Sequence, residues 1–132
     1  ITEMLSNEIK SADWKTEKHV PVIEVQSSVK KGEPFDVRIS LGKEIAHPNT
    51  TEHHIRWISL FFKPEGSAVP YQVGNFEFTA HGESPDGPNE GPVYAQHAII
   101  ATMKTTKSGT LMAASYCNIH GLWEQSVNLT VD

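Results

Sequence analysis

Residues 35–41 alternate between apolar and polar side chains, in the order Phe-Asp-Val-Arg-Ile-Ser-Leu. A period of two residues is typical of a strand with one buried face. Residues 127–131 repeat this alternation near the end of the sequence. Further strands are predicted where β-branched and aromatic residues concentrate, at 20–25, 55–62, 76–80, 94–103 and 110–116. The pattern therefore predicts about seven strands.

Turn-forming residues separate these runs, as at 31–34 (Lys-Gly-Glu-Pro) and 63–66 (Lys-Pro-Glu-Gly). One short helix is predicted over residues 2–13, because Thr2 can cap it and Met4 and Leu5 fall on one face with Ile9. Since no helices alternate with the strands, the predicted fold is all-β: an antiparallel sandwich after a short N-terminal helical segment. A length of 132 residues suits a single domain, residues 1–132.

Composition excludes several functions. The chain carries 11 Lys and Arg against 16 Asp and Glu, and its net charge of −5 argues against nucleic-acid binding. No apolar run approaches the roughly 18 residues of a membrane span, so no membrane association is expected. The start lacks the pattern of a signal peptide, although residues can be missing before Ile1. With Cys117 as its sole cysteine, the chain forms no intrachain disulfide, and we expect a reducing, cytoplasmic location.

Seven histidines accompany that single cysteine, which points to metal chemistry. Those of most interest fall, with Cys117, at three junctions between predicted strands. The junctions are 17–21 (Glu-Lys-His-Val-Pro), 47–54 (His-Pro-Asn-Thr-Thr-Glu-His-His) and 117–123 (Cys-Asn-Ile-His-Gly-Leu-Trp). Because loops at one end of a sandwich can converge, the three segments can contribute to one site.

Each junction alone is ambiguous. Cys117 and His120 form a Cys-x-x-His turn that can place a thiolate and an imidazole on one metal, but a buried thiol beside a surface histidine is an equally simple interpretation. His47 and His53 can reach a common point, yet histidine pairs in loops are often only solvated. His53 and His54 enter a strand and should face opposite ways, so one of them is expected to bind, and spacing does not choose which.

The donor set narrows the choice of metal. Structural zinc sites close with four ligands, whereas four imidazoles and one thiolate would make five. Blue copper adds an axial ligand, commonly Met, to two His and one Cys, but no Met follows His120. Five ligands that leave a sixth position open suit iron, where a thiolate pushes electron density onto a bound oxygen ligand. His19 follows Lys18, whose charge suits a site that must attract an anion.

Together these motifs resemble the superoxide reductases, and more closely their one-iron type, also called neelaredoxin, which shares the iron-binding domain of the desulfoferrodoxins. The matching segments are Glu-Lys-His-Val-Pro at 17–21, His-Pro-Asn-Thr-Thr-Glu-His-His-Ile at 47–55 and Ser-Tyr-Cys-Asn-Ile-His-Gly-Leu-Trp-Glu at 115–124. Residues 78–84 and 87–89 fit as well. The resemblance extends from Trp14 to Val131, and the combination of three motifs makes it specific.

The resemblance implies a seven-stranded immunoglobulin-like sandwich and one non-haem iron that reduces superoxide, with one electron and two protons, to hydrogen peroxide. Glu17 matches the residue that occupies the sixth position of the oxidised iron. Lys18 matches the residue that attracts superoxide and helps to protonate the peroxide. Carried over by motif, the metal ligands are His19, His47, His53 and His120, the last through Nδ1 and the others through Nε2, with Cys117 axial. The motif selects His53 over His54.

The resemblance also implies a rubredoxin-like electron donor and a homotetramer. Two-iron relatives carry an extra four-cysteine module that this sequence lacks, so a separate donor is expected.

Two functions remain as alternatives to a superoxide reductase. They are an electron carrier of the cupredoxin type and a metal-free or zinc-stabilised binding module. We expect backbone amides of residues 118–120 to donate to the Cys117 sulfur. Simpler roles are expected of the other residues: His54 packs beside the site, His81 orders a loop, His97 faces solvent, Trp57, Tyr71 and Tyr116 lie in the core, and Trp123 shields the iron.

Overall fold

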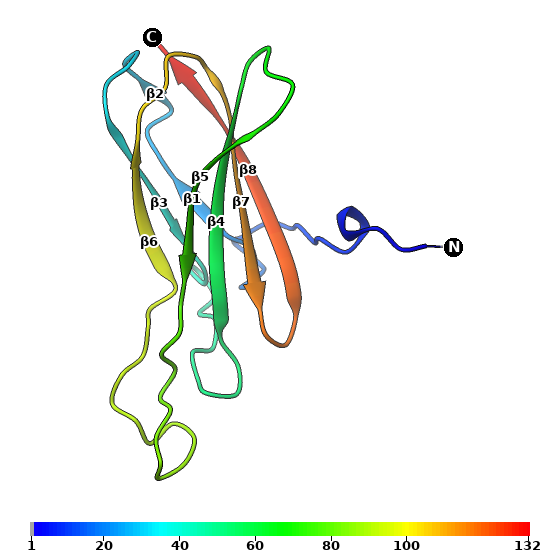
Figure 1. Ribbon diagram of the computed structural model, residues 1–132, viewed down its shortest axis with the longest axis vertical. Helices are drawn as coiled ribbons and strands as arrows, with labels where there is room; N and C mark the ends of the chain where they lie inside the picture. Colours follow the sequence, from blue (N-terminus) through cyan, green and yellow to red (C-terminus); the bar gives the residue numbers. More distant parts are fainter. Residues whose placement is uncertain (1) are drawn as a thin grey trace.

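The computed structural model describes residues 2–132, which form two facing β-sheets (Figure 1). The strands alternate between buried and exposed side chains, as the sequence pattern requires: Val37 and Ile39 are fully buried, whereas Asp36 and Arg38 are exposed. The strands are β1 (Val22–Glu24), β2 (Ser28–Val29), β3 (Phe35–Ser40), β4 (Ile55–Pro64), β5 (Tyr71–Glu77), β6 (Ala98–Met103), β7 (Gly109–Cys117) and β8 (Gly121–Val131).

One sheet has three strands in the order β1-β3-β6, and the other has five in the order β2-β8-β7-β4-β5. Neighbouring strands are antiparallel except β2, which pairs with β8 in parallel. The buried faces of both sheets supply one hydrophobic cluster, with Ile58, Leu60 and Leu111 at 0% exposure. Burial of this cluster is the main force that holds the two sheets together.

The all-β prediction is confirmed, but residues 2–132 form eight strands and not the predicted seven. The missed strand, β2, has two residues, too few to show a period. Its parallel pairing also corrects the prediction of a wholly antiparallel sandwich. The strand predicted at 76–80 lies instead at Tyr71–Glu77, an edge strand whose half-exposed face gives a weak pattern. Tyr71 itself is 61% exposed, so its predicted place in the core is wrong.

The helix predicted over residues 2–13 is also wrong. Only a single 3-10 turn forms, η1 (Leu5–Asn7), and Met4 and Leu5 are 60% and 65% exposed. Two of the three residues of the predicted apolar face are therefore exposed, only Ile9 is half-buried, and Met4 caps the turn without a side-chain hydrogen bond. The arm leaves the sandwich (Figure 1) and is tied to β8 by backbone bonds of Lys10 with Leu122 and Glu124.

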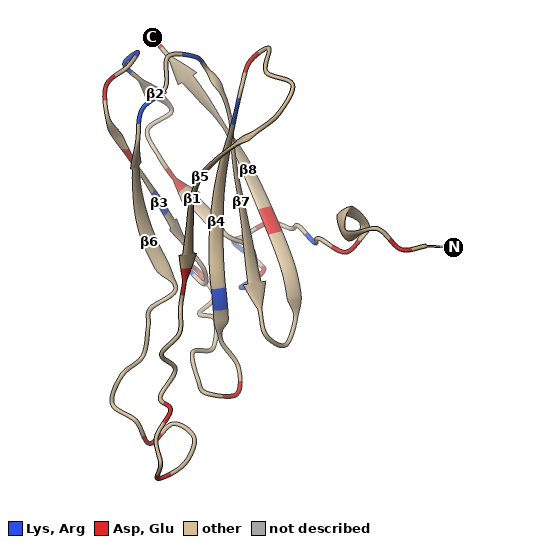
Figure 2. Ribbon diagram, viewed as in Figure 1, with Lys and Arg blue, Asp and Glu red and all other residues tan. Residues whose placement is uncertain are grey.

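Charged residues are spread over the molecule. Lys and Arg lie at scattered positions on both sheets and their loops, interspersed with Asp and Glu (Figure 2). This distribution disfavours a basic surface of the kind that binds nucleic acid. Within residues 2–132 there is no helix with the length and apolar character needed to cross a membrane.

Candidate metal centre

The strand pairing brings the three predicted junctions to one end of the sandwich. Val22 at the start of β1 lies opposite Ser40 at the end of β3, so residue 19 and the β3–β4 loop share an end. Ile55 at the start of β4 pairs with Cys117 at the end of β7, which adds the β7–β8 turn to the same end. The sheet register thus places His19, two histidines of the β3–β4 loop and the Cys-x-x-His turn side by side.

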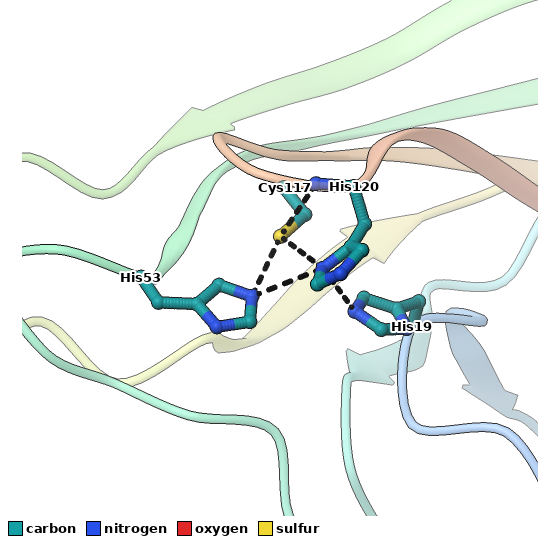
Figure 3. A group of neighbouring side chains, drawn as sticks. All are labelled: His19, His53, Cys117 and His120. Atoms are coloured by element: carbon teal, nitrogen blue, oxygen red, sulfur yellow. Dashed lines mark hydrogen bonds between the residues drawn. The ribbon is translucent and has the colours of Figure 1, made fainter.

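Four of these side chains form a compact group whose ligand atoms all lie within 4.8 Å of one another: His19, His53, Cys117 and His120 (Figure 3). The Nδ1 atom of His120 lies 3.0 Å from His19 Nε2 and 3.3 Å from His53 Nε2. The Cys117 sulfur lies 3.2 Å from His53 Nε2 and 3.9 Å from His120 Nδ1. Two nitrogen ligands at right angles, each about 2.1 Å from one ion, lie about 3.0 Å apart, so this spacing fits a shared metal.

His47 lies beside this compact group but is not within its 4.8 Å limit. Its ring is 4.9 Å, between centroids, from the rings of His19 and His53. The Nδ1–H of His47 donates to the Pro48 carbonyl at 2.6 Å, so Nε2 of the neutral ring carries the free lone pair. That Nε2 is buried and has no hydrogen-bond partner. A buried nitrogen without a partner is costly in a protein, and a metal ion is the partner that its lone pair fits.

A carboxylate fixes the tautomer of His19 in the same manner. Its Nδ1–H donates to Glu17 Oε1 at 2.6 Å, which leaves Nε2 free to face His120. Metal-bound histidines commonly donate their second nitrogen to a carboxylate or a carbonyl oxygen, as His19 and His47 do here. Glu17 is therefore engaged with the His19 ring and does not join the four-residue group.

Burial keeps these histidines neutral. Desolvation lowers the pKa of His47 to about 3, despite the opposing hydrogen bond to Pro48. Burial also lowers the pKa of His19, an effect that Glu17 partly offsets. For His53, burial lowers the pKa and the charges of His120, His19 and Lys18 add to it. Because a metal binds the neutral imidazole, these three rings are already in their metal-binding form at neutral pH.

Lys18 and Glu17 flank the group on the chain that carries His19. The positive charge of Lys18 contributes to the lowered pKa of both His19 and His53. Burial acts to raise the pKa of Glu17, but the hydrogen bonds from His19 outweigh it and hold that pKa below its usual range. Glu17 is thus a carboxylate at neutral pH, and both residues are half-buried.

The turn after Cys117 shapes the sulfur's surroundings. The backbone N–H of His120 donates to the Cys117 sulfur at 3.4 Å, whereas the N–H of Asn118 donates to the His54 carbonyl. The prediction that the backbone amides of residues 118–120 donate to the Cys117 sulfur is therefore wrong for Asn118. Gly121 ends the turn with a φ of 83°, a left-handed conformation that glycine adopts without strain.

Trp123 and His97 pack against histidines of the site, whereas His54 and His81 pack against each other. Trp123 is 9% exposed and stacks on His19 at 5.2 Å between centroids, while its Nε1–H donates to the His120 carbonyl. His54 points away from the group and stacks on His81, 3.5 Å between centroids. His97 is 5% exposed and packs against His47, so its predicted exposure to solvent is wrong. Its sequence neighbours gave no sign of this, because the ring packs against His47, which lies far away in the sequence.

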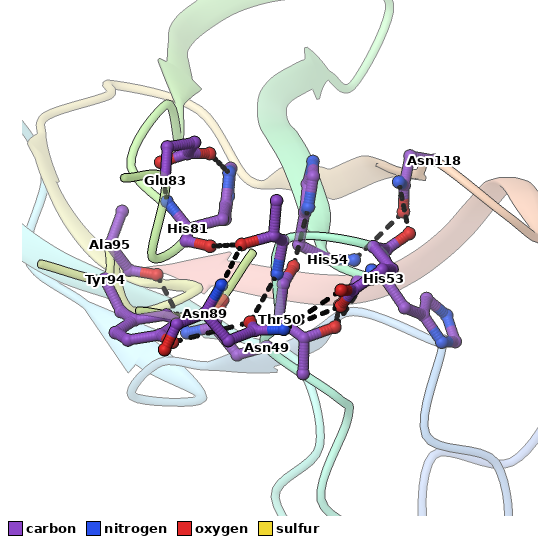
Figure 4. A network of polar contacts seen from close by, with 12 residues as sticks. Asn49, Thr50, His53, His54, His81, Glu83, Asn89, Tyr94, Ala95 and Asn118 are labelled. Carbon is purple, nitrogen blue, oxygen red and sulfur yellow. Dashed lines mark hydrogen bonds and ion pairs between the residues drawn. The ribbon is translucent and has the colours of Figure 1, made fainter. Parts of the chain in front are cut away.

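Sequence reasoning missed a polar network that holds the ligand loop (Figure 4). Asn89 accepts from the Thr51 N–H at 2.8 Å and donates to the Glu52 carboxylate at 2.9 Å. Thr51 in turn donates through its hydroxyl to the His81 carbonyl. Asn118 joins the same loop from the other side. Asn89 has a φ of 63°, unusual for a residue other than glycine, but nothing in the sequence shows which partners it holds.

Comparison with known proteins identifies the family of this chain. Residues 11–126 match the family model described as Desulfoferrodoxin. The chain belongs to the desulfoferrodoxin family. It is 62% identical over 117 residues to a neelaredoxin of Megalodesulfovibrio gigas, covering 89% of this chain and 90% of that protein. It is 58% identical over 126 residues to a superoxide reductase of Pyrococcus furiosus, covering 96% and 99%.

Solved structures of family members share the fold. The crystal structure of a putative superoxide reductase from Thermotoga maritima superposes with a TM-score of 0.97 at 55% identity, covering 99% of each chain. A superoxide reductase (neelaredoxin) from Archaeoglobus fulgidus in the reduced form gives a TM-score of 0.87 at 56% identity, covering 93% of this chain and 98% of that one. Family members therefore carry the same two-sheet architecture.

Proposed function

We propose that this protein is a superoxide reductase, which converts superoxide, one electron and two protons into hydrogen peroxide. The observation that carries the proposal is the convergence of His19, His53, Cys117 and His120 on one point, with ligand atoms within 4.8 Å of one another. The names of relatives more than 50% identical over nearly the whole chain support the substrate.

The residues present fit one iron ion. His19, His47 and His53 would hold it through Nε2, His120 through Nδ1 and Cys117 through its sulfur. The free, buried Nε2 of His47 supports this set, since it otherwise lacks a partner. When bound, the iron supplies the electron and the Lewis-acid site at which superoxide is reduced. A metal-free binding module would leave the His47 nitrogen unsatisfied.

Lys18 attracts the anionic substrate. The protein as a whole carries a charge of −5 and repels an anion, so a local positive potential is needed at the site. A ferrous ion with one thiolate and neutral imidazoles contributes a net charge of about +1. Lys18 precedes the proposed ligand His19 in the chain, and its positive charge already acts on the pKa of His19 and His53. Its ammonium group adds to this positive potential and can donate a proton.

Glu17 orients one of the proposed ligands, and Cys117 provides the sulfur ligand. Glu17 holds the His19 ring in the tautomer that presents Nε2. For Glu17 to occupy the sixth position of the oxidised iron, as the resemblance implies, its carboxylate must first leave His19. The Cys117 thiolate is buried at 1% exposure and accepts a hydrogen bond from the His120 amide, which moderates the electron density it donates.

As the resemblance implies, the electron comes from a small donor such as rubredoxin. We further propose a cytoplasmic homotetramer with an immunoglobulin-like sandwich as its protomer. The donor can be identified by mixing the oxidised protein with candidate reduced carriers and following its re-reduction.

The product ratio tests the reaction. Superoxide is supplied to the reduced protein, with a reductant present, and both superoxide consumed and peroxide formed are measured. A reductase gives one peroxide per superoxide and oxidises the reductant in step. One peroxide per two superoxides, with the reductant untouched, would identify a dismutase instead and overturn the proposal.

A further inference from the structure

Asn118 occupies a special place between the two loops that carry metal ligands. The hydrogen-bonded ladder between β4 and β7 ends at the pair Ile55 and Cys117, where β7 turns away toward His120. Asn118 is the next residue, and its backbone N–H donates to the His54 carbonyl at 3.2 Å. The ladder is thus extended by one further backbone bond beyond the last strand pair.

The side chain of Asn118 adds two further hydrogen bonds to the loop that carries His53. Its Oδ1 accepts from the backbone N–H of His54 at 2.9 Å, and its Nδ2 donates to the backbone carbonyl of Glu52 at 2.9 Å (Figure 4). These two peptide groups lie immediately before and immediately after His53. One carboxamide therefore brackets the backbone of a predicted ligand, while Asn118 itself follows Cys117, another predicted ligand, in the chain.

Only a carboxamide satisfies both contacts. The His54 N–H needs an acceptor and the Glu52 carbonyl needs a donor, and Asn offers one of each in a planar group. Aspartate offers no donor when ionised, and an apolar side chain offers neither. Apart from the bonds of Asn118 itself, which include its backbone N–H to the His54 carbonyl, the hydrogen-bonding contacts within residues 2–132 that join residues 47–54 to the turn 117–120 involve the ligand atoms themselves.

We propose that Asn118 is a positioning residue of the metal centre, whose carboxamide fixes the His53 backbone against Cys117 so that His53 Nε2 and the Cys117 sulfur can bind one ion. The 3.2 Å separation of those two atoms is the distance that this bracket sets. The inference rests on the metal site proposed above, and it extends that proposal to a residue that does not touch the metal. Partners of this kind typically change metal affinity by about 10- to 100-fold.

Cobalt(II) is the probe for the test, since its thiolate charge-transfer band reports the metal–sulfur bond without any turnover. The metal-free wild type, Asn118→Ala and Asn118→Leu are titrated with cobalt(II) and compared with Asn128→Ala, in which an exposed asparagine on β8 is changed. Both Asn118 variants are expected to bind cobalt about tenfold more weakly or worse, with a shifted or weakened thiolate band. Asn128→Ala is expected to match the wild type.

Asn118→Leu keeps the size of the side chain, so it provides the answer if the alanine variant does not fold. Folded Asn118 variants with the wild-type cobalt affinity and thiolate band would overturn the proposal, even if the metal-free protein unfolded more easily, because that result describes a purely structural residue. Failure of the wild type to show a cobalt–thiolate band would instead overturn the metal site itself, which keeps the two failures distinct.

Discussion

The Nε2 atom of His53 lies 3.2 Å from the Cys117 sulfur, while the ring of the next residue, His54, faces away and stacks on His81. The two residues directly precede β4, where the chain becomes extended and successive side chains point in opposite directions. The sequence alone left the choice between them open. In the structure, the His53 ring lies among the candidate ligands, whereas the His54 ring packs against His81 beside them.

This difference predicts different metal contents for two variants. His53→Ala removes a proposed ligand, and we expect a loss of iron affinity of more than about 100-fold, beyond the range typical of residues outside the ligand set. His54→Phe keeps a stacking partner for His81 and should retain about one iron per chain. Iron and protein are assayed together after metal loading. Equal iron contents in the two variants would show that the assignment is wrong.

Lys18→Ala should slow the encounter with superoxide by up to about tenfold, because it removes positive potential at the site. The rate should also depend less on ionic strength, since screening acts on the charge that is lost. Lys107→Ala is the matched control: it removes the same charge from the loop before β7, at the opposite end of the sandwich. Pulse-generated superoxide at several salt concentrations gives both quantities. An unchanged rate and salt slope in Lys18→Ala would refute the steering role.

Two substitutions of Glu17 separate its hydrogen bond to His19 from its proposed binding to the oxidised iron. Glu17→Gln keeps an oxygen that can accept from His19 Nδ1, whereas Glu17→Ala removes it. We expect the alanine variant to hold iron about tenfold more weakly and the glutamine variant to hold it nearly normally. Both should reduce superoxide at near-normal rates and lose the spectral form in which a carboxylate binds the oxidised iron. A large fall in encounter rate for Glu17→Gln would contradict this division.

The metal-free protein should become less stable as the pH falls below about 6.5. In the folded state the pKa of His47 is about 3, because the ring is buried, so the unfolded chain binds a proton at higher pH than the folded one. A group with a depressed folded pKa stabilises the fold above its unfolded pKa, and that contribution is lost as the pH falls. Between pH 7.5 and 5.5, the protonation of His47 in the unfolded chain alone should lower the free energy of unfolding by about 1 kcal/mol.

Urea unfolding of the metal-free protein at the two pH values measures this change. The lowered pKa values of His19 and His53 act in the same direction. The variant His47→Leu has no proton to gain at this position, so its stability should fall less over the same range. An equal pH dependence in wild type and His47→Leu would mean that His47 is not buried in its neutral form.

Much of the fold was predictable because its strands have one buried face. The alternation at residues 35–41 corresponds to β3, and the apolar runs at 55–62 and 110–116 lie within the two central strands β4 and β7. Prediction failed where burial does not dictate the pattern. The edge strand β5 is half-exposed, β2 has only two residues, and the side chains of Met4 and Leu5 in the N-terminal arm are exposed.

The candidate site was predictable as a set of residue types but not as an arrangement. The spacing of Cys117 and His120 within one turn is visible in the sequence, and the structure brings both to His53 and His19. The partners that orient the rings, such as the Pro48 carbonyl for His47, depend on loop conformation and leave no sequence signal. The bracket by Asn118 is invisible for the same reason, since its partners are backbone groups more than 60 residues away.

The most direct test of the account is the metal content of the purified protein, measured with its visible spectrum before and after a mild oxidant. We expect about one iron per chain and an intense thiolate-to-iron band that appears on oxidation and disappears on reduction. Zinc or no metal, without colour, would contradict the proposed centre and favour a binding module. Stoichiometric copper with a strong blue band would contradict it as well, in favour of an electron carrier.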